Sequence, residues 1–152
     1  MQVVFGIVRR FPIWTAIGVF SLVGFVFHDF LSGSVEDLKV GECFDVPAGV
    51  TTLKDVQHHP CTSGHDAEMI YIGSISGSTA TYAGVAAFEA FAKANCVPAF
   101  NSYLGRDFDT DEIYDMTFLY PTTDGWTNGD RVINCFVVRI DGHQMTATVR
   151  AP

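Results

Sequence analysis

Charged residues are scarce in this sequence, and basic ones are scarcest. Asp, Glu, Lys and Arg make up 17% of the 152 residues, where a soluble domain averages about 25%. Nine Lys and Arg stand against seventeen Asp and Glu, which gives a formal net charge of −8 at pH 7. Phosphate binding requires a basic surface, so this balance argues against a nucleic-acid-binding protein. The length suits one domain of ordinary size.

Sequence signatures of catalysis and of metal binding are missing as well. The sequence has no G-x-S-x-G, no H-E-x-x-H, no phosphate-binding glycine loop and no EF-hand spacing. None of its four cysteines forms C-x-x-C, the usual signature of thioredoxin-like exchange and of zinc knuckles. We therefore predict a protein that is not an enzyme, with no cofactor, no metal and no small-molecule substrate.

One long apolar segment near the N-terminus accounts for the low charge. Residues 11–27 are all uncharged and nearly all apolar. Extended to Leu31, the segment would form a helix of about 31 Å, which matches a hydrocarbon core of about 30 Å. Pro12 suits the first turn of a helix, and Trp14 suits a membrane interface. We predict a transmembrane helix at residues 11–31.

The charges beside this segment predict its orientation. Arg9 and Arg10 precede it, whereas acidic residues follow it from Asp29 onward. By the positive-inside rule, residues 1–10 form a cytoplasmic tail and the rest of the chain is extracytoplasmic. A cleaved signal peptide is the alternative, with a poor small-residue site at 32–34. The apolar run is longer than a typical signal-peptide core, so we favour an uncleaved single-pass anchor in the cell membrane.

The remaining sequence, residues 39–152, has the pattern of an α+β domain joined to the anchor by a polar linker at 32–38. A helix is predicted at 82–95, where apolar residues recur at intervals of three and four, with Pro98 ending or kinking it. An acidic loop is expected at 107–112. The stretches typical of strands are 42–46, 53–57, 67–75, 113–120, 132–140 and 144–149. We predict an antiparallel sheet with one main helix.

The four cysteines predict two disulfides, because an even number in a small exported domain is typical of a disulfide-stapled fold. Three connectivities are possible. We favour Cys43–Cys61, which would close a short turn between neighbouring strands. The second pair is then Cys96–Cys135, which would tie the helix to a core strand.

Histidines cluster around one of these cysteines. His58, His59 and His65 lie within eight residues together with Cys61, and carboxylates follow directly. Such a set is compatible with zinc or copper. A disulfide would withhold the Cys61 thiolate, however, and the first two histidines point to opposite faces of an extended chain. We favour a disulfide-anchored turn in which His65 is hydrogen-bonded near the start of a strand.

A second stretch, residues 121–131, is rich in turn-forming residues and contains one Trp. Gly129 permits a positive φ, and Asp130 can pair with Arg131 or cap a backbone N–H. A ligand-binding loop is the alternative. We favour a rigid turn that places Trp126 over the core.

Taken in order, these motifs resemble the septum-formation domain of actinobacterial membrane proteins, over about residues 39–150. The resemblance implies an extracytoplasmic, non-catalytic module, often carried on a single transmembrane helix. It carries over no catalytic residue. The motifs are Gly41-x-Cys43-Phe44, Pro60-Cys61-x-x-x-His65-Asp66-x-Glu68, Cys96-x-x-x-Phe100-x-x-Tyr103-x-Gly105 and Pro121-x-x-x-x-Trp126-x-x-Gly129-Asp130-Arg131-x-x-x-Cys135.

Two functions are compatible with these features. The first is an accessory or scaffold protein whose domain docks on an integral membrane protein complex. That complex would serve division and the envelope, transport, or respiration, as in a respiratory supercomplex. The second is a small metal- or ligand-binding envelope protein that uses His58, His59 and His65.

Overall fold

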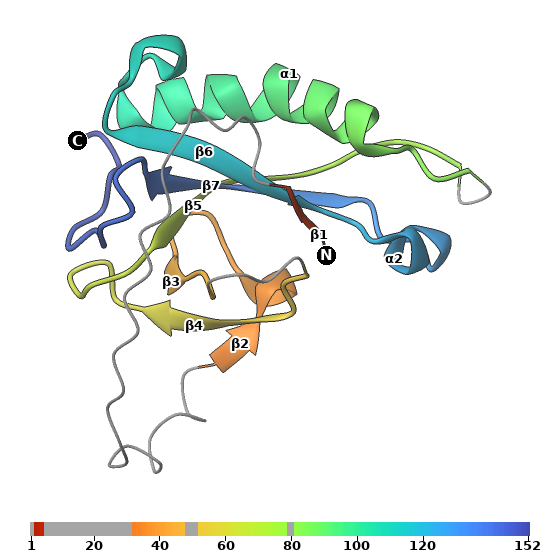
Figure 1. Cartoon of the computed structure of the whole chain (residues 1–152), viewed down its shortest axis with the longest axis horizontal. Coiled ribbons are helices and arrows are strands. Elements are labelled where there is room, and N and C mark those ends of the chain that lie inside the picture. Colours follow the sequence, from red (N-terminus) through yellow and green to blue (C-terminus); the bar gives the residue numbers. More distant parts are fainter. Residues whose placement is uncertain (1, 5–31, 48–51, 79–80) are drawn as a thin grey trace.

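The computed structural model describes residues 2–4, 32–47, 52–78 and 81–152. Seven described strands form one sheet in the order β1-β6-β7-β5-β3-β4-β2, and every neighbouring pair is antiparallel (Figure 1). The strands are β1 (Gln2–Val4), β2 (Ser32–Ser34), β3 (Cys43–Asp45), β4 (Asp55–His59), β5 (Ala67–Ser74), β6 (Tyr114–Tyr120) and β7 (Val132–Arg139). The predicted α+β class, with an antiparallel sheet and one main helix, is confirmed.

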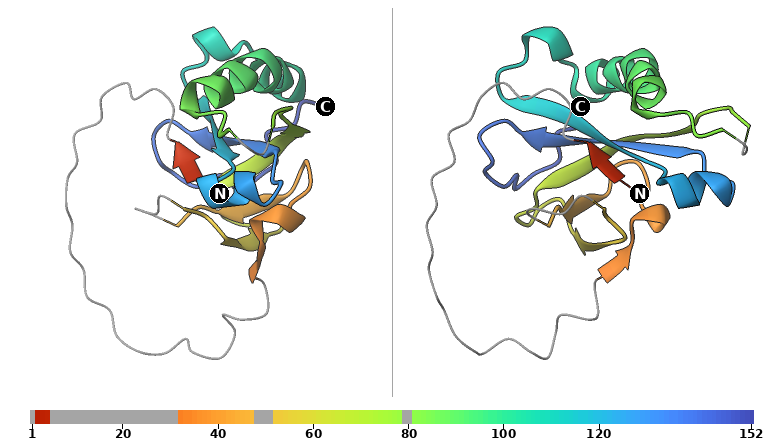
Figure 2. Two further views of the ribbon diagram at one scale, coloured as in Figure 1. Left: turned by 90° about the vertical axis from the view of Figure 1, so that its right-hand side faces the viewer. Right: turned by 45° about the vertical axis from the view of Figure 1, so that its right-hand side comes forward.

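The main helix, α1 (Val85–Leu104), covers one face of the sheet over β5, β6 and β7 (Figures 1 and 2). Its buried side chains recur every fourth residue, at Phe88, Ala92, Cys96, Phe100 and Leu104. The helix begins after Gly84 and ends at Gly105, whose φ of 65° is the left-handed conformation of a helix C-terminus.

The predicted helix, 82–95, was too early at its start and too short. Gly84 is the residue before the helix, and α1 continues through Pro98. Pro98 lies on the exposed side of α1, where a backbone carbonyl that loses its N–H partner is accessible to solvent. Cys96 and Phe100 are buried on either side of Pro98, so packing against the sheet holds the helix together there.

The opposite face of β5 and β7 is covered by the strands at one edge of the same sheet. Strands β2, β3 and β4 lie on the side away from α1 (Figure 2). Phe44, Leu53 and Val56 pack there against Met69 of β5 and Phe136 of β7. The domain therefore has two apolar layers, one on each face of β5 and β7.

Residues 32–38 belong to the domain, so the prediction of a polar linker there is wrong. Ser32–Ser34 pair with β4, and η1 (Val35–Asp37) follows directly. Val35 and Leu38 are only 2% and 4% exposed. Val35 and Leu38 pack in the same apolar cluster. The two acidic residues between them make the segment resemble a linker in the sequence.

The first residues of the chain also lie in the sheet. Gln2–Val4 pair antiparallel with Phe118–Tyr120 at the outer edge of β6. These three residues belong to the segment 1–10 that was predicted to form a cytoplasmic tail. This pairing is incompatible with the predicted span at residues 11–31, which would place Gln2–Val4 and β6 on opposite sides of a bilayer. The predicted span and the rest of the tail lie outside the described residues. Within the described part, no helix is long and apolar enough to cross a membrane.

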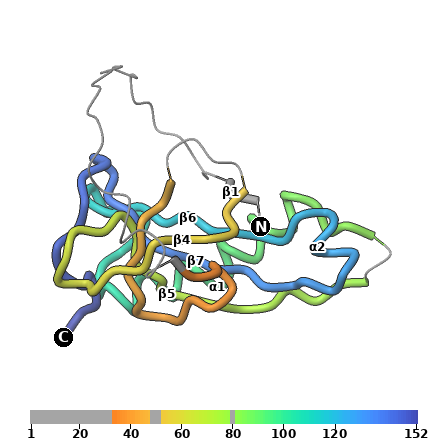
Figure 3. The backbone as a smooth tube through the Cα atoms, turned by 90° about the horizontal axis from the view of Figure 1, so that it is seen from below, coloured from red at the N-terminus to blue at the C-terminus, as the bar shows by residue number. Residues whose placement is uncertain are grey.

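The C-terminal segment and α2 (Thr123–Thr127) lie at opposite ends of the domain (Figures 1 and 3). The predicted strand at 144–149 is mostly irregular and makes an isolated bridge between Met145 and His65. The two sequence motifs are thereby separated. The histidine motif lies near the C-terminal segment, and the Trp126 turn lies at the other end.

Candidate functional site

The candidate site is built around a buried carboxylate. Glu68 is 0% exposed and lies in β5 directly opposite Cys43 of β3. Its Oε1 accepts hydrogen bonds from the Tyr103 hydroxyl and the Thr148 hydroxyl, each at 2.6 Å. Its Oε2 accepts from the backbone N–H of Val149 at 2.8 Å. Glu68 therefore holds α1 and the C-terminal segment to the sheet.

The tyrosine in this network remains a donor at neutral pH. Burial, and then the hydrogen bond to the Glu68 carboxylate, raise the pKa of Tyr103 to about 12. The Arg150 guanidinium stacks 5.5 Å from the centroid of the Tyr103 ring, and Ala151 donates its N–H to the Tyr103 carbonyl. The C-terminal segment is thus fixed to α1 by ring and backbone contacts as well as through Glu68.

Both disulfides have the connectivity that we favoured from the sequence. Cys43–Cys61 joins β3 to the turn after β4, with 5.2 Å between its Cα atoms. Cys96–Cys135 joins α1 to β7, with 6.1 Å between its Cα atoms. The second bridge is fully buried, whereas Cys61 of the first is partly exposed.

The three histidines have separate partners. The His65 ring is 0% exposed, with Nδ1 2.8 Å from the Ser63 carbonyl. The Nε2 of His59 lies 2.8 Å from the Asp45 carboxylate. His58 occupies the neighbouring position in β4 and lies 3.8 Å from Glu42. No shared ligand set joins these rings, so the geometry does not support the histidine metal site.

One set of potential ligand atoms does come together in the described part of the chain. The sulfurs of Cys43 and Cys61 and a carboxylate oxygen of Glu68 lie within 4.8 Å of one another. The two sulfurs are bonded to each other, so neither is available as a thiolate ligand in this state. Asp66, the remaining carboxylate of the motif, caps the Val46 N–H at 3.1 Å and accepts from Gln144 at 3.2 Å.

The loop around Trp126 is a packed turn. The indole is 1% exposed, and its Nε1 donates to the Ser78 carbonyl at 2.8 Å. The Arg131 guanidinium covers the ring at 3.7 Å from its centroid and donates to the Trp126 carbonyl. Asp130 accepts from the Val132 N–H at 2.9 Å, and Gly129 has a φ of 96°. Each residue singled out in this loop thus supports the turn itself.

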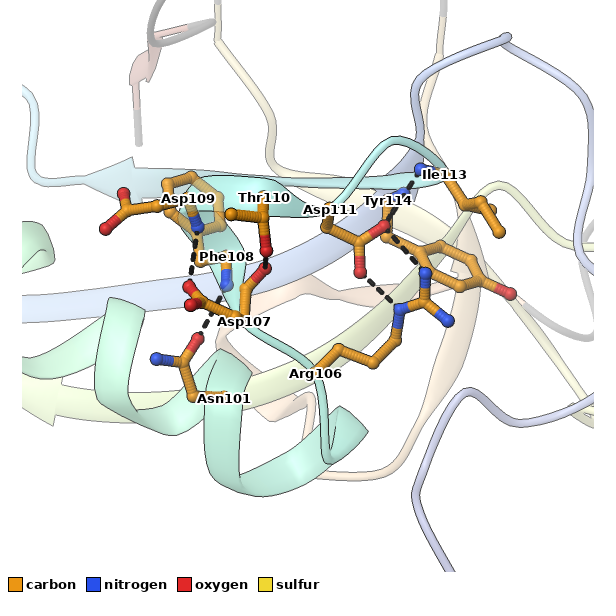
Figure 4. Close-up of polar contacts among 9 residues, drawn as sticks. All are labelled: Asn101, Arg106, Asp107, Phe108, Asp109, Thr110, Asp111, Ile113 and Tyr114. Carbon is orange, nitrogen blue, oxygen red and sulfur yellow. Dashed lines mark hydrogen bonds and ion pairs between the residues drawn. The ribbon is translucent and has the colours of Figure 1, made fainter.

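The acidic loop uses its carboxylates in the same local way (Figure 4). Asp107 accepts from the Asp109 N–H at 3.0 Å, at the start of η2 (Phe108–Thr110). Asp111 pairs with Arg106 and accepts from the N–H groups of Ile113 and Tyr114 at 2.8 and 2.9 Å. These carboxylates cap the turn that leads from α1 into β6.

We expect this turn to contribute to acid sensitivity. Burial opposes ionisation of Asp111, but Arg106 and the two N–H groups outweigh it and lower the pKa. A carboxyl with a lowered folded-state pKa stabilises the fold above its unfolded value of about 3.9. That stability is lost as the pH falls through the folded-state pKa. Asp111→Asn should therefore flatten the acid limb of a stability–pH curve measured by urea unfolding.

The matched control for this prediction is Asp109→Asn, which removes the same charge from the same loop without touching Arg106. We expect this control to keep the wild-type acid limb. Equal flattening in both variants would show that net charge, and not the Asp111 network, sets the acid sensitivity.

Some of these contacts had no signal in the sequence. Tyr103 was part of a motif, but nothing marked Thr148 or Asp45 as partners of Glu68 and His59. The pair Glu68 and Thr148 is 80 residues apart in the chain, so only the folded sheet brings the two together.

The comparisons with known proteins give one match. The family described as "Septum formation" matches residues 40–151. Comparison with curated proteins and with solved structures finds no match. The matched range contains both disulfides, the Glu68 network and the Trp126 turn.

Proposed function

Because the chain belongs to the septum-formation family, with a role in cell division or the cell envelope, we propose that it is a membrane-anchored accessory protein. It does no chemistry of its own in this role. Its extracytoplasmic domain docks on a larger integral membrane complex of an actinobacterial cell. Residues 11–31 hold it to the membrane as a single span, with residues 1–10 in the cytoplasm.

The observation that carries this proposal is a disulfide-stapled domain preceded by a long apolar segment. Two disulfides within 112 matched residues suit an oxidising compartment outside the cytoplasm. An uncharged stretch of 17 residues at 11–27 suits a bilayer. Together these features favour a domain exported on its own anchor.

Anchoring has a structural consequence at the edge of the sheet. If residues 11–31 cross the bilayer, Gln2–Val4 are separated from β6 by the membrane. The pairing at Phe118–Tyr120 is then absent, and that part of the β6 edge is free. The topology of residue 3 therefore distinguishes the anchored chain from the arrangement with β1 in the sheet.

We predict that a cysteine at position 3 is inaccessible from outside the cell. In Val3→Cys, a membrane-impermeant maleimide should label this residue only after the cells are lysed, because the tail is cytoplasmic. Asn101→Cys, on the exposed side of α1, is the control and should be labelled in intact cells. Labelling of position 3 in intact cells would contradict the anchor and would favour the strand pairing seen in the structure.

We further predict that the span contacts helices of the partner. Small residues recur at every third position, at Thr15, Gly18, Ser21 and Gly24, and small residues allow close approach of helices in lipid. Replacing the span by poly-Leu of equal length, with Arg9, Arg10 and Asp29 kept, should reduce co-purification of the partner complex in mild detergent. Export and folding should be unchanged, as reported by the two disulfides. Wild-type co-purification would show that the span is a tether alone.

A further inference from the structure

We propose that Cys43–Cys61 is an exchangeable disulfide that reacts with thiols, and that Glu68 accepts the proton of Cys43 in this reaction. This inference does not depend on the proposed function. No sequence motif marks this bridge as exchangeable, because the two cysteines are 18 positions apart and form no C-x-x-C.

The two cysteines differ in their exposure to solvent. Cys43 is 1% exposed in the middle of the sheet, whereas Cys61 lies partly exposed in the turn that follows β4. Exchange begins with attack of a thiolate on one accessible sulfur. Cys61 is that sulfur, and Cys43 is then the buried leaving group. In Cys96–Cys135, by contrast, both residues are 0% exposed.

Glu68 lies beside the buried sulfur with acceptor capacity to spare. Directly opposed residues of antiparallel strands project on the same side of the sheet, which places Glu68 next to Cys43. A carboxylate offers about four lone-pair sites, and the Glu68 network occupies three of them with Tyr103, Thr148 and Val149. One site on Oε2 remains, on a carboxylate whose oxygen lies within 4.8 Å of both sulfurs.

Exchange proceeds in two steps in each direction. In reduction, a thiolate R–S⁻ bonds to the Cys61 sulfur, the S–S bond breaks, and the Cys43 thiolate takes a proton from the Glu68 carboxyl, which has received it from solvent. A second R–S⁻ then releases Cys61 as R–S–S–R forms. In oxidation, Cys61 first forms a mixed disulfide with R–S–S–R. The Cys43 thiol then passes its proton to Glu68 and attacks the Cys61 sulfur, releasing R–S⁻.

The first experiment tests access in the folded protein. Dithiothreitol under native conditions should reduce Cys43–Cys61 and leave Cys96–Cys135 intact, as read by alkylation and peptide mapping. With glutathione disulfide, Cys43→Ser should form a stable mixed disulfide at Cys61, whereas Cys61→Ser should leave Cys43 unmodified. Release of both disulfides together, and only on unfolding, would overturn the proposal.

The second experiment tests Glu68. Oxidation of the reduced wild-type protein by glutathione disulfide is quenched with acid, and the mixed disulfide at Cys61 is followed by mass spectrometry. Glu68→Gln should slow its resolution on the order of 10²-fold, the size of a lost general base. Glu42→Gln is the matched control, since it changes the same group one residue from Cys43, and should resolve at the wild-type rate.

A structural effect of the substitution is separable from loss of the base. Thr148→Val loosens the Glu68 network but keeps the carboxylate, so it should also resolve at the wild-type rate. If Glu68→Gln does not fold, Glu68→Asp decides, because it retracts the carboxylate from the sulfur and should slow resolution. Wild-type resolution in a folded Glu68 variant, or equal slowing in Thr148→Val, would overturn the role of Glu68.

The thiol has two possible sources, a small thiol or a cysteine in a polypeptide. Reduced glutathione and a short peptide with one cysteine serve as the two probes. Reaction of either at Cys61 supports the exchange, and the faster probe identifies the source. Reaction of neither would overturn it.

Discussion

Replacing Trp126 with alanine should lower the free energy of unfolding by about 3–5 kcal/mol, the cost of deleting a fully buried aromatic ring. The ring packs edge-on against Phe88 and Tyr82, with centroid distances of 5.8 and 5.9 Å. The Arg131 guanidinium covers the indole ring, and the indole Nε1 donates a hydrogen bond to the Ser78 carbonyl. The substitution therefore opens a cavity and releases the 76–78 segment at once. Urea unfolding followed by circular dichroism measures the effect.

Two further variants separate the parts of this effect. Trp126→Phe keeps an aromatic ring and loses the bond to Ser78, so its loss should be smaller. Gly77→Ala leaves Trp126 in place but should still destabilise the fold, because the added Cβ would lie 2.7 Å from the indole Cζ2. A Trp126→Ala protein with wild-type stability that no longer co-purifies with its complex would identify the loop as an interface and contradict the structural role.

The second large effect is expected for the buried disulfide. Removing Cys96–Cys135 with a double alanine substitution should cost about 4 kcal/mol, because the bridge closes a loop with a sequence separation of 39 residues. Alanine is small and apolar, so it leaves no unsatisfied group between α1 and β7. Tethering α1 to the sheet restricts the unfolded chain, and that restriction is lost in the variant.

The matched comparison is the double alanine variant of Cys43 and Cys61. Its loop has a sequence separation of 18, so the expected loss is smaller, about 3 kcal/mol. The order of the two losses in urea unfolding is the readout. A larger loss for the shorter loop would contradict the entropic account and would point to native-state packing around Cys43.

Local patterns predicted the main helix and most of the long strands of the domain. Apolar residues at intervals of three and four marked the helix, and stretches typical of strands marked β5, β6 and β7, because these patterns reflect the geometry of one element on its own. The even number of cysteines predicted two bridges, and their flanking elements favoured the pairing that the structure contains. The motif order indicated the family that residues 40–151 match.

Contacts between distant residues were decided by the tertiary structure alone. Val35 and Leu38 belong to the apolar layer on the sheet face away from α1, although their local sequence is that of a linker. They are buried there because β2, β3 and β4 bring them against the same side chains of β5 and β7. Pro98 is tolerated inside α1 because packing on both sides outweighs one missing hydrogen bond. His58 and His59 are separated because neighbouring residues of β4 point to opposite faces, and His65 lies beyond β4 in the bridge to Met145. Glu68 meets Cys43, Tyr103 and Thr148 because strand order and helix docking, which no local pattern encodes, bring four separate segments to one point.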